Sequence, residues 1–189
     1  MKTLLVKFAI LGFILSLAAC GPKKDDSKEA AEDQNEKKFD DTKIEGDTEF
    51  AVSAADAGMF EVKAGELAQT NGYSSEVKSF AKMMIEEHSK ANAELTDAAA
   101  SKNITLPAYL SNNAQGNYDA LAKKTGKDFD DAYTDLMVKG HKDVLDLFKK
   151  EAADGKDADL KAWATGKVAI IEHHLEMAKQ TEEIVDKMK

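Results

Sequence analysis

The sequence predicts an all-α protein built as a four-helix bundle, and three observations carry that prediction. Helix-forming residues dominate residues 48–189, where Pro107 is the one proline and no stretch of alternating β-branched residues is typical of a strand. Apolar residues recur there at spacings of three and four in four long segments. Two short connections and one long one separate these segments, which predicts two antiparallel helical hairpins joined by a crossover.

The first predicted hairpin joins helices over residues 48–71 and 74–102. Asp47 or Thr48 can cap the first of these helices, because a short polar side chain satisfies free backbone N–H groups. Gly72 stands where the first helix ends, as is usual for a residue just beyond a helix. So short a connection forces the two helices to lie antiparallel.

The second predicted hairpin joins helices over residues 128–153 and 157–188. Between the hairpins, residues 103–126 break the helical pattern, except for a weak helical patch over residues 112–124. A connection of this length between two tight hairpins is typical of the ferritin-like arrangement of a four-helix bundle, whereas an up-down-up-down bundle would need a shorter one. The predicted fold is therefore a ferritin-like bundle, with its domain at residues 48–189.

Residues 1–19 have the layout of a lipoprotein signal peptide. Lys2 and Lys7 make a positive start, residues 8–17 are almost all apolar, and small residues stand just ahead of Cys20. The apolar run would be about 15 Å long as a helix, too short for a hydrocarbon core of about 30 Å. The cysteine at the cleavage point resembles the lipobox of bacterial lipoproteins, so we expect Cys20 to carry the lipid and the membrane to be a partner.

Residues 20–47 are expected to form the lipidated cysteine and a charged, disordered tether. Lys, Asp and Glu dominate this segment, which has too little apolar surface to offset its ordering entropy. Its stretch 23–26, Lys-Lys-Asp-Asp, resembles the export signal of some surface-displayed lipoproteins, although a plain charged linker is the alternative. Gly21 is not the aspartate associated with inner-membrane retention, which favours the outer membrane within the cell envelope.

Charge and composition exclude several classes of function. The formal net charge is −9, and the sequence contains no arginine, which argues against nucleic-acid binding and against bidentate clamping of phosphate. Cys20 is the one cysteine, so its lipidation would leave neither a disulfide nor a thiol nucleophile. No glycine-rich phosphate loop and no nucleophile elbow occurs in the sequence.

Each histidine falls near the middle of a predicted helix. His88 lies on the second helix, His141 on the third, and His173 with His174 on the fourth, while Glu61 lies at the middle of the first. The midpoints of equally long helices lie at one level of a bundle, so Glu61, His88, His141 and His174 can converge. One carboxylate and three imidazoles suit a single transition-metal ion such as Zn, Cu, Fe or Mn.

The pattern also leaves room for a site without metal. No glutamate stands three residues before His88 or His174, so the paired Glu-x-x-His motifs of di-iron proteins are missing. Glu86 and Glu87 are assigned to the solvated face, and His173 is interpreted as a solvent-side neighbour of His174. A buried Glu–His pair could also serve only to set the register of the helices.

Several stretches resemble the bacterial ferritin-like family catalogued as domain of unknown function 4142. They are 57–62 (AGMFEV), 80–88 (FAKMMIEEH), 91–95 (ANAEL), 129–133 (FDDAY), 137–141 (MVKGH) and 174–175 (HL). The resemblance covers about residues 48–185. It implies a secreted or periplasmic four-helix domain, often described as an outer-membrane protein, and brings no established activity.

The sequence therefore indicates an exported, lipid-anchored bundle whose core binds one metal ion for buffering or stress protection. The alternative is a non-enzymatic envelope protein whose polar centre serves packing alone. A mononuclear metalloenzyme would also need an open coordination site and a cleft, and the sequence shows neither. The sequence does not indicate which protein this chain binds.

Overall fold

A computed structural model describes residues 26–188, and these residues form an all-α fold. The predicted fold class is confirmed. The signal peptide and Cys20 lie outside the described residues. None of the described helices is both long enough and apolar enough to cross a membrane. The helices are α1 (Ser27–Phe39), α2 (Glu45–Asn71), α3 (Ser75–Ser101), α4 (Asn112–Ala122), α5 (Gly126–Asp154) and α6 (Ala158–Asp186).

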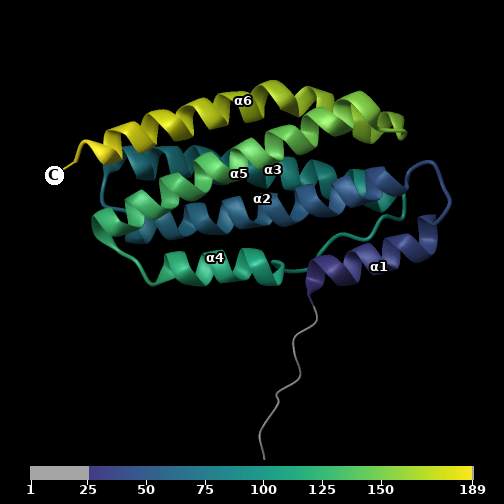
Figure 1. The fold of residues 1–189 in the computed structure, drawn as a ribbon, viewed down its shortest axis with the longest axis horizontal. Helices are drawn as coiled ribbons and strands as arrows, with labels where there is room; N and C mark the ends of the chain where they lie inside the picture. Colours follow the sequence, from purple (N-terminus) through teal and green to yellow (C-terminus); the bar gives the residue numbers. More distant parts are fainter. Residues whose placement is uncertain (1–25, 189) are drawn as a thin grey trace, which may run out of the picture.

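Four long helices form the bundle, as two antiparallel hairpins (Figure 1). The first hairpin is α2 with α3, and the second is α5 with α6. The connection between them carries α4 back along the bundle, so that α3 and α5 run in the same direction. A parallel bridge between Gly72 and Gly126 holds the turn of the first hairpin against the start of α5. This is the topology that the lengths of the connections predict.

The turn of the first hairpin is held by a carboxylate from the second. Asp130 of α5 is fully buried, and its two oxygens accept hydrogen bonds from the backbone N–H groups of Tyr73 (2.9 Å) and Ser74 (2.8 Å). Backbone groups at helix ends have no partner within the helix, so a buried end needs such an acceptor. The two hairpins are thereby joined at this end of the bundle.

The opposite end repeats the arrangement with the roles exchanged. Asp47 of α2, also buried, accepts hydrogen bonds from the backbone N–H groups of Lys156 (2.8 Å) and Asp157 (3.2 Å) in the turn of the second hairpin. Asp47 stands 25 residues before Gly72, which ends α2, and Asp130 stands 25 residues before Gly155, which ends α5. These two reciprocal contacts fix the register of one hairpin against the other. The sequence suggested Asp47 as a cap of its own helix. Its carboxylate instead binds the turn of the second hairpin.

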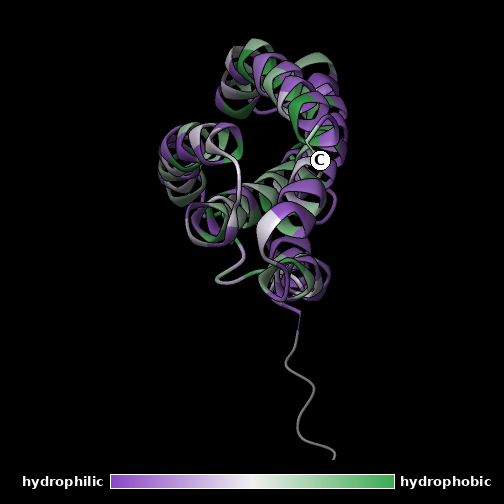
Figure 2. Ribbon diagram, turned by 90° about the vertical axis from the view of Figure 1, so that its left-hand side faces the viewer, coloured by the Kyte–Doolittle hydropathy of each residue, from purple (hydrophilic) through white to green (hydrophobic). Residues whose placement is uncertain are grey.

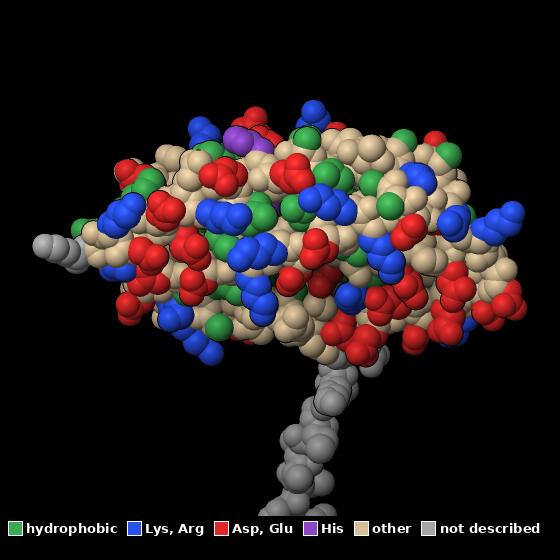
Figure 3. All heavy atoms as spheres, turned by 45° about the horizontal axis from the view of Figure 1, so that its top comes forward, with side chains coloured by type: hydrophobic (Ala, Val, Ile, Leu, Met, Phe, Trp, Pro, Cys, Tyr) green, Lys and Arg blue, Asp and Glu red, His purple; other side chains and the backbone are tan. Residues whose placement is uncertain are grey.

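Each bundle helix is amphipathic, as its apolar spacing predicts. Figure 2 looks along the helices and shows hydrophobic and hydrophilic residues alternating within each ribbon. Gly65 allows α2 and α3 to approach closely, since a Cβ atom there would lie 3.2 Å from the carbonyl oxygen of Ala81. On the face seen in Figure 3, Lys side chains are interspersed with Asp and Glu, which suits a soluble surface.

The expectation of a disordered tether is wrong over the described part of residues 20–47. Residues Ser27–Phe39 form α1, which begins at the N-cap Asp26. Its apolar contacts are few, with Ala31 buried and Phe39 packed against the core, and polar contacts join it to the crossover. Asn35 exchanges two hydrogen bonds with the backbone of Thr105 (2.8 and 2.7 Å), and the Ser27 hydroxyl accepts from the N–H of Ala108 (2.9 Å).

The domain therefore begins earlier than residue 48. Helix α2 starts at Glu45, three residues before the predicted start, and it has no side-chain cap. The other predicted starts are close: Ser74 caps α3 by accepting from the N–H of Val77 (3.1 Å), and Asp157 caps α6 by accepting from the N–H of Leu160 (3.0 Å).

A buried carboxyl group beside Asp47 makes stability depend on pH. Burial, together with the hydrogen bond and the negative charge of Asp47, raises the pKa of Glu151 from 4.5 to about 8. A raised carboxyl pKa contributes stability that is complete below pH 4.5 and is lost as the pH rises through about 8. We therefore expect the melting temperature of the parent chain to fall between pH 4.5 and about 8, the window that those two values define.

Glu151→Gln removes this titration and is expected to flatten the fall, which thermal melts across that range measure. The matched control is Glu66→Gln, at an exposed position of α2. An equal fall in the Glu151→Gln variant would show that another group causes it.

Candidate metal centre

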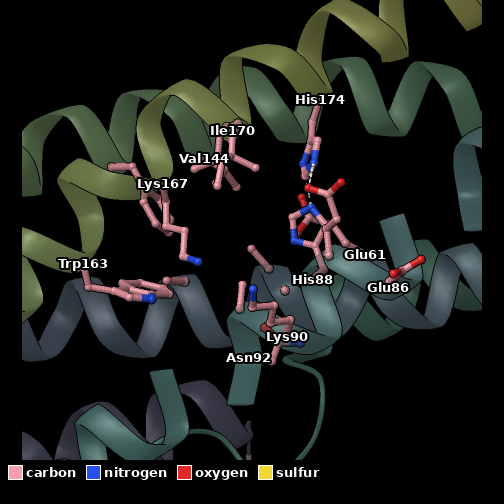
Figure 4. A pocket seen from close by; sticks show the side chains of 17 residues that line it. Glu61, Glu86, His88, Lys90, Asn92, Val144, Trp163, Lys167, Ile170 and His174 are labelled. Carbon is pink, nitrogen blue, oxygen red and sulfur yellow. Dashed lines mark hydrogen bonds and ion pairs between the residues drawn. The ribbon is translucent and has the colours of Figure 1, made fainter. Parts of the chain in front are cut away.

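The four side chains that the sequence singled out meet in the middle of the bundle. Glu61 projects from α2, His88 from α3, His141 from α5 and His174 from α6. All four are buried, with exposed fractions of 4%, 7%, 0% and 2%. Figure 4 shows three of them, Glu61, His88 and His174, pointing toward one another. Each long helix of the bundle therefore contributes one side chain to a single cluster.

The rings of the three histidines are packed against one another. Their centroids are 5.1 to 5.7 Å apart, and one ring nitrogen from each lies within 4.8 Å of those of the other two. The closest pair is His88 Nε2 and His174 Nδ1, at 3.2 Å. A tetrahedral ion with metal–nitrogen distances of about 2.0–2.1 Å holds its ligands somewhat closer than the widest of these pairs.

Each histidine uses its other ring nitrogen to hold its orientation. His88 Nδ1 lies 2.8 Å from Glu61 Oε2, His174 Nε2 lies 2.9 Å from Glu87 Oε2, and His141 Nδ1 lies 2.8 Å from the Met137 carbonyl oxygen. All three partners are acceptors, so these ring nitrogens carry hydrogen and donate. In a neutral imidazole the remaining nitrogen is then a bare lone pair. The three remaining nitrogens are His88 Nε2, His174 Nδ1 and His141 Nε2.

The inner nitrogen of His141 has no hydrogen-bond partner among residues 26–188. It lies 3.6 Å from Glu61 Oε1, so two groups that both accept hydrogen bonds face each other in a buried place. Unpaired buried polar atoms are rare and costly, and each needs an explanation. A cation between the ring and the carboxylate would satisfy both.

The pKa values of the four side chains are shifted by burial and by one another. Burial acts to raise the pKa of Glu61, but the adjacent His88 and His141 hold it below its usual value. Burial acts to lower the pKa of His88, yet the charge and hydrogen bond of Glu61 hold it above its usual value. Burial lowers the pKa of His141 and His174. These directions favour charge on Glu61 and His88 and disfavour it on His141 and His174.

A protonated His88 would carry a hydrogen on Nε2, which lies 3.2 Å from His174 Nδ1. A metal ion bound to the three inner nitrogens would take the place of this proton. Metal affinity is then expected to weaken as the pH falls, because proton and metal compete for the same lone pairs.

The sequence pattern of the family described as "Domain of unknown function (DUF4142)" matches residues 28–181. The chain belongs to this family. The match begins within α1 and includes every residue of the cluster, so the DUF4142 domain takes in the helix that the sequence reasoning assigned to the tether. No curated protein and no solved structure matched the chain.

Two glutamates make contacts that the sequence did not predict. Glu61, proposed as a metal ligand, orients His88 through Oε2 and keeps Oε1 toward His141. Glu87, assigned to the solvated face, is half-exposed but reaches across to His174 on α6. Only the packing of α3 on α6 brings Glu87 to His174, so spacing within one helix carried no signal for this contact. His173 is exposed, as predicted.

This donor set fits a transition-metal ion in the DUF4142 domain. Histidine ligands in metalloproteins commonly donate their second N–H to a carboxylate or a backbone carbonyl, and all three histidines do so here. Imidazole suits Zn, Cu, Fe and Ni, and an added carboxylate also suits Mn. Three protein nitrogens would leave a tetrahedral or larger coordination sphere incomplete.

Proposed function

We propose that the chain binds one transition-metal ion, Zn, Cu, Fe or Mn, in the centre of the bundle. His88, His141 and His174 are the ligands, and Glu61 either completes the sphere through Oε1 or remains a partner of His88. The observation that carries the proposal is the unpartnered Nε2 of His141, which is buried, held in one tautomer and turned toward a carboxylate. If the polar centre served packing alone, this buried nitrogen would have no hydrogen-bond partner, and its lost hydration would destabilise the fold.

We also propose that the protein works in the cell envelope as a lipid-anchored metal-buffering domain of the ferritin-like class. The lipobox-like residues before Cys20 support the anchor, and the two hairpins with a long crossover support the class. Because α1 begins at Ser27, six residues lie between Cys20 and the first helix. Fully extended, these span about 20 Å, so the domain would stay close to the membrane surface.

Elemental analysis of the purified chain tests the metal proposal. The chain is prepared without a metal-binding tag, loaded with each of the four metals in turn, and dialysed. We expect about one equivalent of a single preferred ion, since one cluster of three histidines holds one ion. The triple variant His88→Ala, His141→Ala and His174→Ala is expected to bind none, while its circular dichroism shows whether the helices persist.

His173→Ala is the matched control, because this histidine neighbours His174 but is exposed. It is expected to bind metal like the parent. A parent chain that stays metal-free after all four loadings would overturn the proposal and leave the centre as a packing device. Equal metal content in the parent and a folded triple variant would place the ion elsewhere.

A further inference from the structure

A pocket of about 320 Å³ leads from the surface of the bundle to the histidine cluster. Its lining begins with exposed residues, such as Ile170 at 39%, and ends at three buried members of the cluster, Glu61, His88 and His174. His141, the fourth member, does not line it. The cluster is therefore buried but not sealed, and the pocket is a path along which a small solute can reach it.

The pocket is large enough for a metal ion that still carries its water. A water molecule takes up about 30 Å³ in the liquid, so the pocket has room for about ten of them. Figure 4 shows the open space between the cluster and the opposite wall, where Trp163 and Lys167 lie. An ion can thus enter hydrated and exchange water for ring nitrogen at the inner end.

Carboxylates outnumber ammonium groups around the pocket. Three glutamates and two lysines line it: Glu61, Glu86, Glu87, Lys90 and Lys167. Lys167 Nζ pairs with Glu94 Oε2 at 2.6 Å, so the charge of this lysine is already compensated. The remaining balance is negative, which attracts cations to the pocket and repels anions.

The other walls of the pocket are largely apolar, and they strengthen this attraction. Val144, Phe148 and Ile171 are among the apolar side chains that line it. Walls of low dielectric constant focus the field of the charges in a cleft, which raises the association rate constants of oppositely charged solutes by about 10–1,000-fold. Salt screens such a field, so the rate gain shrinks as the ionic strength rises.

Glu87 is the carboxylate best placed to act on an entering cation. It is half-exposed, it lines the pocket, and its Oε2 accepts a hydrogen bond from His174 Nε2 at 2.9 Å. It therefore carries charge at the solvent side of a ring whose other nitrogen lies in the cluster. Glu61, by contrast, is only 4% exposed.

We propose that this pocket is the entrance through which a divalent cation reaches the three histidines, and that Glu87 attracts the ion into it. The proposal rests on the metal site proposed above and concerns how that site is filled and emptied. The pocket then sets the rates of metal uptake and release, whereas the ring nitrogens set the affinity.

A bulky residue at position 170 tests the route. Ile170→Trp narrows the pocket at a partly exposed position without emptying the core. A narrower path raises the barrier in both directions, so we expect Co²⁺ uptake and release to slow by the same factor, at least about threefold, with Kd unchanged. Stopped-flow absorption of bound Co²⁺ measures uptake, and transfer to excess chelator measures release. Ile184→Trp is the matched control, because Ile184 is 41% exposed on the same helix and does not line this pocket.

Glu87→Gln tests the role of the charge. The amide oxygen of glutamine can still accept the hydrogen bond of His174, so the substitution removes the charge alone. We expect uptake to slow at least about threefold at low salt and to match the parent at about 1 M salt, where the Debye length is about 3 Å. A residue that only held His174 in place would change the rate equally at both salt concentrations. Glu76→Gln is the control, at an exposed position of α3 that does not line this pocket.

The outcomes distinguish the two proposals. A chain that takes up no Co²⁺ overturns the metal site and the entrance together. Three results would overturn the entrance and leave the metal site in place: uptake at the parent's rate in either pocket variant, a loss in Glu87→Gln that salt does not alter, or equal slowing in the control variants.

Discussion

Replacing His141 with asparagine is expected to abolish metal binding while the bundle stays folded. The asparagine amide can still donate to the Met137 carbonyl, as His141 Nδ1 does, but it has no atom in the place of Nε2. Loss of a partner that only orients a ligand costs about 10–100-fold in affinity, so loss of a ligand should cost at least about 100-fold. Competition with a chromophoric chelator measures this loss.

Thermal melts with and without metal give an independent readout of the same substitution. A ligand that binds only the native state raises the melting temperature of the parent, and this rise should vanish in His141→Asn. Without metal, the variant should lose no more than about 1–2 kcal/mol of unfolding free energy, as for ordinary core substitutions. His173→Asn serves as the control. Undiminished metal affinity in His141→Asn would remove His141 from the ligand set.

Replacing Asp130 with alanine is expected to lower the free energy of unfolding by about 3 kcal/mol. The substitution leaves the backbone N–H groups of Tyr73 and Ser74 without their acceptor in a buried place. Each unpaired buried donor costs about 1–3 kcal/mol, and bonds to a charged acceptor are the stronger ones. For a domain of this size we expect the melting temperature to fall by about 10 °C.

The adjacent Asp131 provides the control for Asp130. Its carboxylate pairs with Lys127 at 2.7 Å on the surface, and exposed pairs contribute about 0–1 kcal/mol. Asp130→Asn keeps one acceptor oxygen and should lie between the two alanine variants in chemical denaturation. If Asp130→Ala proved as mild as Asp131→Ala, the turn would not depend on this carboxylate.

The sequence predicted the bundle and the composition of its centre because both depend on features that repeat along one helix. Apolar spacing marks the buried stripe, and glycine at residues 72 and 155 marks the helix ends. Once the helices are antiparallel and of similar length, their midpoints must lie at one level. This reasoning brought Glu61, His88, His141 and His174 together before any contact was known.

Contacts between elements could not be predicted in the same way. Helix α1 lacks an apolar stripe and is held instead by Ser27 and Asn35, whose partners lie about 70–80 residues further along the chain. Composition alone therefore assigned it to a tether. The reach of Glu87 to His174 depends on how α3 lies against α6, and that rotation is a property of the packed bundle.

Asp47 and Asp130 each bind the turn of the other hairpin, and these contacts bear on the order in which the chain folds. Each hairpin has mainly local contacts and can form early, but its turn lacks its acceptor until the other hairpin docks. Glu61 and His88 lie on one hairpin, and His141 and His174 lie on the other. The four side chains of the proposed metal site come together only at this last step. An ion bound at that proposed site would thus be drawn from whichever compartment the chain has reached when its two hairpins dock.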